Sequence, residues 1–239
     1  MNTKHVYLMP GMAASPKIFE FISLPESFET HLLSWIPPKK KEPLSDYAKR
    51  MCQRIEHPNP ILLGVSFGGV LIQEMAHHLD AAQLIIVSSI KSNKELPIPM
   101  KMAHHSNIHK LLPTQWVVNL ETLALFAFGD GIKKRIALYQ RYLSERDADY
   151  LSWSIDALVH WEQEAPPSNF LHIHGKSDTV FPVKNLHQPA TISKLSKPSI
   201  DPSMMTPLII MTFAFIMIGI AIAILRIKTE IISRKSYLS

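Results

Sequence analysis

The sequence predicts an α/β fold: a mainly parallel sheet flanked by helices, with a helical lid insertion and a C-terminal transmembrane helix. Three observations carry this prediction. Short apolar runs of strand length alternate with segments of helical periodicity, residues 92–167 break that alternation, and residues 208–225 carry no charge. The chain has 239 residues, of which 46% are hydrophobic and 19% are charged, as in a folded domain of moderate size.

The alternating region contains five predicted strands and two predicted helices. The strands cover residues 6–9, 31–35, 61–64, 84–87 and 170–175, and the helices cover residues 45–56 and 68–79. Ser45 is the predicted N-cap of the first helix. Strands that alternate with helices along a chain are typical of a parallel sheet.

The predicted lid, about 92–167, is rich in Met, His, Leu and aromatic residues. Within it, residues 133–144 and 147–161 have helical periodicity, and Pro166 and Pro167 end the second helix. Because the insertion lies between two sheet strands in sequence, we expect it to cover one edge of the sheet.

The chain changes character after the globular domain, which we place at residues 1–184. Residues 185–206 are predicted to be a linker or the remnant of a last strand, with 190–195 as the candidate strand. A transmembrane helix over 207–226 and a basic tail over 227–239 follow. The uncharged stretch begins at Leu208 and ends at Leu225, and its 18 residues are the lower end of what spans a bilayer. We therefore expect the membrane to be a partner of this segment.

Charge, the N-terminal sequence and the single cysteine indicate which partners and which cellular location to expect. The net charge is +5 without a basic stripe interleaved with aromatic residues, so no nucleic-acid partner is expected. The N-terminus lacks a signal-peptide pattern, which favours a cytoplasmic domain with one C-terminal span. Arg226 and Lys228 after the span favour the opposite orientation. The single cysteine, Cys52, falls in a predicted helix, and we expect a buried, unreactive thiol.

Ser66 is the candidate nucleophile. It is the centre of Gly64-Val65-Ser66-Phe67-Gly68, which follows an apolar predicted strand and precedes an amphipathic predicted helix. A serine at such a sharp turn crowds the residues two before and two after it, and glycine at both places removes the Cβ atoms that would clash. The start of the following helix also favours a developing oxyanion.

The predicted oxyanion hole consists of two backbone N–H groups. The turn Met9-Pro10-Gly11-Met12 follows the first predicted strand, where one such donor is needed. We therefore expect the N–H groups of Met12 and Phe67 to be the two donors.

Asp178 is the candidate acid. It lies in the loop after the strand-like run that ends at Gly175, where a carboxylate can orient a base imidazole and stabilise its protonated form. His172 and His174 in that run are spaced like a metal pair, but no third ligand is evident, and we interpret them as core or edge histidines. No metal and no organic cofactor are expected.

With these three segments together, residues 4–184 resemble the α/β-hydrolase superfamily. The similarity is to small bacterial members with a Pro-Gly oxyanion turn, a Gly-x-Ser-x-Gly-Gly elbow and a His-x-His-Gly-x-x-Asp segment. The resemblance implies a Ser–Asp–His triad in that chain order, in which Ser66 and Asp178 match the nucleophile and the acid. It also implies an esterase-like hydrolase acting on a small acyl substrate that the lid encloses.

The triad histidine departs from that pattern. The loop after the candidate last strand, residues 196–205, contains no histidine, and His187 is the only histidine after Asp178. His187 is therefore the predicted base, and three lid histidines are alternatives: His104, His105 and His109. A serine without a base is a poor nucleophile. The sequence thus leaves two further hypotheses open, a hydrolase-like binding protein with an impaired triad, and a hydrolase whose C-terminus was altered by a frameshift or fusion.

Overall fold

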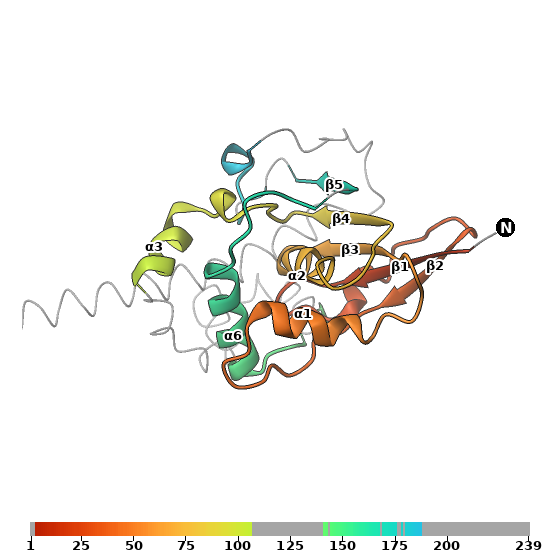
Figure 1. Ribbon diagram of the computed structural model, residues 1–239, viewed down its shortest axis with the longest axis horizontal. Coiled ribbons are helices and arrows are strands. Elements are labelled where there is room, and N and C mark those ends of the chain that lie inside the picture. Colours follow the sequence, from red (N-terminus) through yellow and green to blue (C-terminus); the bar gives the residue numbers. More distant parts are fainter. Residues whose placement is uncertain are drawn as a thin grey trace, which may run out of the picture.

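The computed structural model describes residues 3–106, 141–142, 144–167, 169–175, 178 and 180–187 (Figure 1). Within this part of the chain, five strands form one parallel sheet in the order β2-β1-β3-β4-β5. The strands are β1 (Lys4–Met9), β2 (Phe28–Leu32), β3 (Ile61–Val65), β4 (Gln83–Val87) and β5 (Phe170–Ile173). The predicted α/β class and parallel sheet are confirmed.

The described helices are α1 (Leu44–Cys52), α2 (Phe67–Met75), α3 (Ile98–Ser106) and α6 (Ala148–Val159), with three short 3₁₀ helices, η1 (Pro16–Phe19), η2 (Asn93–Glu95) and η6 (Val183–Asn185). Figure 1 shows α1 and α2 along the sheet, and α3 and α6 beyond the carboxyl ends of its strands. The described part of the predicted lid segment thus includes α3 and α6.

The sheet has an apolar layer on each face because its strands alternate. Tyr7 and Met9 of β1 belong to the larger core, which α1, α2 and α6 complete. Val6 and Leu8 point to the other face and pack with Phe19 of η1 in a smaller cluster.

Two local predictions were wrong. The second strand covers residues 28–32 rather than 31–35. Leu33 still donates its N–H to the Leu8 carbonyl at 3.0 Å, and the apolar side chains of Leu33 and Trp35 are buried in the core beyond the strand. Helix α1 begins at Leu44 with Pro43 at the N-cap, so Ser45 does not cap it. The other predicted elements differ from the observed ones at their ends.

The C-terminal predictions fall outside the described residues. Among the helices that the structure describes, none has both the length and the apolar character needed to cross a bilayer. The predicted transmembrane segment, the linker with its candidate strand at 190–195, and most of the predicted helix over 133–144 lie in the part that is not described.

Candidate active site

Ser66 forms the entire turn between β3 and α2. Its backbone has φ 52° and ψ −122°, a conformation that L-residues rarely adopt. Three hydrogen bonds hold it there: the Ser66 N–H donates to the Val87 carbonyl at 2.9 Å, and the Ser66 carbonyl accepts from the Gly69 N–H at 2.9 Å and from Ser89 Oγ at 2.7 Å. Such strain persists only where the surroundings over-determine it, and it is typical of functional sites.

The flanking glycines are required by contact distances. A Cβ on Gly64 would lie 2.3 Å from the Gly68 carbonyl oxygen, and a Cβ on Gly68 would lie 2.3 Å from the Pro10 carbonyl oxygen. A Cβ on Gly69 would meet Ser89 Oγ at 2.5 Å. The predicted steric requirement for glycine at positions 64 and 68 is therefore confirmed.

The turn after β1 lies directly against the start of α2. Strand register places Met9 opposite Gly64, so both strands end at the same edge. A Cβ on Gly11 would lie 3.4 Å from Ser66 Cβ. Within the described residues, the N–H groups of Met12 and Phe67 donate to no acceptor. The Phe67 N–H directly follows Ser66 at the positive end of the nine-residue helix α2, and Met12 directly follows Gly11.

Aromatic side chains support this turn, and the sequence analysis missed their role. The indole N–H of Trp35 donates to the Gly11 carbonyl at 2.9 Å, and the Trp35 ring stacks on Phe67 with centroids 5.3 Å apart. The ring centroid of Tyr150 in α6 lies 5.4 Å from that of Trp35, and the ring centroid of Trp153 lies 6.1 Å from that of Phe67. The rings therefore connect the lid to both sides of the Ser66 turn.

Backbone contacts fix the lid to the same loop. The Ser15 N–H donates to the Tyr142 carbonyl at 2.8 Å, and the Glu145 N–H donates to the Ala13 carbonyl at 3.1 Å. Arg141 pairs with Glu20 at 2.7 Å. The residues that follow Met12 are thus held by the lid as well as by the sheet.

Asp178 is almost buried in the loop after β5. Its Oδ1 accepts the N–H groups of Val180 at 2.8 Å and Phe181 at 2.9 Å. Its Oδ2 is buried and has no hydrogen-bond partner among the described residues. Because an unpaired buried acceptor costs about 1–3 kcal/mol, this oxygen is a place where a donor is expected.

The two histidines of β5 and its loop form a buried pair, as predicted for core histidines. His172 Nε2 lies 3.0 Å from His174 Nδ1, and His174 Nε2 lies 2.8 Å from the Phe181 carbonyl oxygen. His174 Nε2 is also 3.5 Å from Asp178 Oδ2. Since a carbonyl can only accept, the His174 Nε2 proton points to Phe181, and the Asp178 oxygen keeps room for another donor. Burial is the main cause that lowers the pKa of His172 to about 4, so His172 is neutral at pH 7.

His187 lies beyond η6 with an exposed side chain. Its backbone N–H donates at 2.8 Å to Glu95, a fully buried carboxylate that also accepts the Lys91 N–H. The structure thus anchors the His187 backbone, and the described contacts do not bring its ring onto Ser66 or Asp178. Among the lid alternatives, the His104 ring contacts the Val159 carbonyl at 3.1 Å, whereas the side chain of His105 and all of His109 are outside the described part.

The parallel sheet gathers the candidate groups. Ser66 follows β3, Met12 follows β1 and Asp178 follows β5, so all three lie beyond the carboxyl ends of parallel strands. This edge is where open α/β sheets bind ligands. This edge of the sheet therefore holds a strained serine, two backbone N–H groups without acceptors among the described residues, and a buried carboxylate. The described contacts bring no histidine ring onto the serine.

The chain is similar in fold to solved structures that include a hydrolase, a bromoperoxidase and a thioesterase. A hydrolase from Pseudomonas aeruginosa PA01 has 16% sequence identity and a TM-score of 0.53, covering 77% of this chain and 76% of its own. BpoC from Mycobacterium tuberculosis H37Rv is described as a putative non-heme bromoperoxidase. It has 11% sequence identity and a TM-score of 0.53, covering 89% of this chain and 92% of its own. RedJ, a thioesterase of Streptomyces coelicolor, has 13% identity and a TM-score of 0.51 over 76% and 70%.

The C-terminal part has a different similarity. Residues 179–238, about a quarter of the chain, match the family model described as CcmC, heme exporter protein C. The match begins one residue after Asp178. The comparison with curated proteins gave no match.

Proposed function

We propose that this chain, which has the α/β-hydrolase fold, is an esterase-like serine hydrolase acting on an ester or related acyl substrate. The observation that carries the proposal is the backbone conformation of Ser66, which has φ 52° between β3 and α2. The backbone packs so closely around this turn that Gly64 and Gly68 have no room for a Cβ atom. A strained serine at the carboxyl edge of the sheet is the arrangement that exposes a nucleophile.

In the proposed reaction, Ser66 Oγ attacks the acyl carbonyl carbon while a base imidazole takes its proton. The N–H groups of Met12 and Phe67 stabilise the oxyanion of the tetrahedral intermediate. The imidazolium then protonates the leaving alcohol, an acyl-serine forms, and water releases the acid by the same steps in reverse. Asp178 Oδ2, buried without a partner, would accept the Nδ1 proton of that imidazole.

We further propose His187 as the base. It is the only histidine after Asp178 in the chain, its ring is exposed, and its backbone is anchored on Glu95 close to the end of the described region. For catalysis its imidazole has to reach both Ser66 Oγ and Asp178 Oδ2.

Labelling of the full-length protein with a fluorophosphonate probe tests the nucleophile. Wild type is expected to be labelled and Ser66→Ala unlabelled, while Ser45→Ala, which removes an exposed serine, should label like wild type. Unlabelled wild type, or labelled Ser66→Ala, would contradict the hydrolase proposal.

The same assay tests the base separately. His187→Ala should lower the labelling rate at least 100-fold, because the serine loses its proton acceptor. His77→Ala, which removes an exposed histidine just after the C-terminal end of α2, should leave the rate unchanged. An unchanged rate for His187→Ala would refute this base and leave the role of Ser66 intact.

A second candidate is a hydrolase-like chain with an impaired triad, either a binding protein or a hydrolase whose C-terminus was altered by a frameshift or fusion. The observation that favours it is the position of the CcmC match, which starts at residue 179, where the hydrolase pattern should go on to its histidine. Wild type without fluorophosphonate labelling would favour this candidate. Reading the DNA in the other two frames after the codon for Lys184 tests the frameshift, since it predicts a glycine-rich turn with histidine there.

We also propose that residues 208–225 anchor the protein in the membrane in a single pass, with the hydrolase domain in the cytoplasm. The uncharged sequence and the match to an exporter family support the anchor. Wild type should resist carbonate extraction from membranes. The double variant Phe215→Arg/Ile218→Arg should be released, since each arginine costs about 2.5–3.5 kcal/mol at a span centre. Protease protection of residues 1–184 in inside-out vesicles would contradict the cytoplasmic orientation.

A further inference from the structure

Three histidines from separate segments of the chain lie on one face of the sheet. His5 is the second residue of β1, His31 is in β2, and His57 is in the loop between α1 and β3. In the parallel register, His5 lies opposite Glu29 and Tyr7 lies opposite His31. Because side chains alternate along a strand, these four residues point to the same face.

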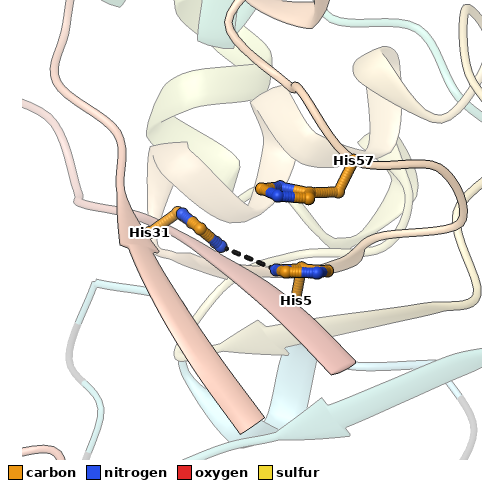
Figure 2. A group of neighbouring side chains, drawn as sticks. All are labelled: His5, His31 and His57. Atoms are coloured by element: carbon orange, nitrogen blue, oxygen red, sulfur yellow. Dashed lines mark hydrogen bonds between the residues drawn. The ribbon is translucent and has the colours of Figure 1, made fainter. Parts of the chain in front are cut away.

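The imidazoles are close enough to share an ion. His5 Nδ1 and His31 Nε2 are 3.0 Å apart, and the His57 ring stacks on His5 with centroids 3.5 Å apart. Figure 2 shows the three rings gathered together, with His57 above His5 and His31 beside them. One nitrogen from each ring can be chosen so that all three lie within 4.8 Å of one another. In a tetrahedral zinc site with Zn–N near 2.0–2.1 Å, ligand nitrogens lie about 3.4 Å apart.

Neighbouring groups suit a cation. Glu29 Oε2 is 3.5 Å from His5 Nδ1, and Glu29 Oε1 is 4.0 Å from His31 Nε2. The Glu29 side chain is 57% exposed, so it can turn toward an ion as a fourth ligand.

Tyr7 can hold one of the rings in place. Its hydroxyl lies 2.7 Å from His57 Nδ1 and also accepts the Glu56 N–H at 3.0 Å. If Nδ1–H donates to Tyr7, His57 Nε2 carries the lone pair that a metal needs. Histidine ligands almost always have such an outer partner. A cavity of about 520 Å³ lined by Tyr7 and His31, among others, gives access from solvent.

We propose that His5, His31 and His57, with Glu29 as a fourth ligand, bind a divalent transition-metal ion such as Zn²⁺. Imidazole nitrogens suit zinc, copper and nickel better than calcium or magnesium. The ion would join the edge strand β2 to β1 and to the segment before β3. His5 lies near the start of β1, His31 lies opposite Tyr7 in β2 and His57 precedes β3, whereas Ser66 follows β3. The role is therefore structural and independent of the hydrolase proposal.

Calorimetric titration with Zn²⁺ tests the site on full-length protein in detergent, free of any polyhistidine tag. Wild type should bind one equivalent. His57→Gln and His31→Gln should each weaken binding at least 10-fold, and Tyr7→Phe should weaken it roughly 10-fold. His77→Gln, an exposed histidine outside the cluster, should bind as wild type does. Wild type that binds no zinc, or ligand variants that bind as tightly as wild type, would overturn the proposal.

Two measurements on wild type guard against misfolded variants. Co²⁺ should give the intense visible absorption of a tetrahedral site, and Zn²⁺ should displace it. A weak octahedral spectrum would overturn the assignment. Zinc should also slow amide hydrogen exchange in residues 28–32, and unchanged exchange there would overturn the role in joining β2 to the sheet.

Discussion

The substitution Gly68→Ala tests the packing that creates the Ser66 turn, without reference to activity. A Cβ at this position would lie 2.3 Å from the Pro10 carbonyl oxygen, 2.7 Å from the Met9 carbonyl oxygen and 3.0 Å from the Pro10 carbonyl carbon. All three atoms are backbone, so no side chain can rotate away. An ordinary Cβ contact begins near 3.4 Å, and the turn after β1 and the start of α2 must therefore separate by about 1 Å.

Overpacking of this kind costs about 1–3 kcal/mol, and the better helix propensity of alanine returns at most about 1 kcal/mol. We expect a net loss of roughly 2 kcal/mol in the free energy of unfolding. For a domain of this size that corresponds to a fall in Tm of roughly 4–8 °C. Urea and thermal unfolding followed by circular dichroism measure both quantities.

Gly175→Ala is the matched control. Its Cβ would meet only Ser88 Oγ, at 3.7 Å, which is an ordinary contact. We expect it to change stability by less than about 0.5 kcal/mol. If Gly68→Ala proved as stable as Gly175→Ala, the close approach of the two turns would be wrong, and the steric account of the Ser66 conformation with it.

Three further predictions concern other buried groups. Trp35→Phe keeps a ring on Phe67 but removes the donor to the Gly11 carbonyl, and should lower the free energy of unfolding by about 1–3 kcal/mol; a change near zero in urea unfolding would count against that bond. His172 has its pKa lowered to about 4, mainly by burial, against about 6.5 when unfolded, so the unfolded chain binds the extra proton between these values. Stability should therefore fall as pH drops from about 6.5 to 4, by up to about 1.4 kcal/mol per pH unit more than in His172→Gln; equal slopes would refute this. Burial raises the pKa of the Cys52 thiol from 9.0 to about 11, which lowers the fraction of reactive thiolate at pH 8. A disulfide reagent at pH 8 should therefore react on the order of 100-fold more slowly with folded than with unfolded protein. Equal rates would show an exposed thiolate.

The sheet and the Ser66 turn could be predicted from the sequence because both depend on local patterns. The apolar run before Ser66 and the glycines around it are steric requirements that act over five residues, and the structure shows each clash they avoid. The edge strand was misplaced because Leu33 and Trp35 are apolar for another reason: they fill the core beyond the strand. Periodicity reports burial and does not distinguish a strand from a buried loop.

Contacts between distant segments could not be predicted in this way. Trp35 reaches Gly11, and Ser89 reaches the Ser66 carbonyl, only after the strands are placed side by side. The same holds for His5, His31 and His57, which share no sequence spacing and come together through strand register and one loop. A period-two pattern of His5 with Tyr7 and of Glu29 with His31 was the one available signal.

The pairing of β4 with β5 has a consequence for the evolution of this domain. The two strands are hydrogen-bonded neighbours, yet β4 ends at Val87 and β5 begins at Phe170, so the whole lid is an excursion between adjacent positions of the sheet. The entropy of closing such an excursion rises only by about 0.6 kcal/mol for each doubling of its length. Changes in the length of the lid that leave the core contacts of α6 intact therefore cost the sheet very little closure entropy. The length of this segment can change while the strands that position Ser66 stay fixed.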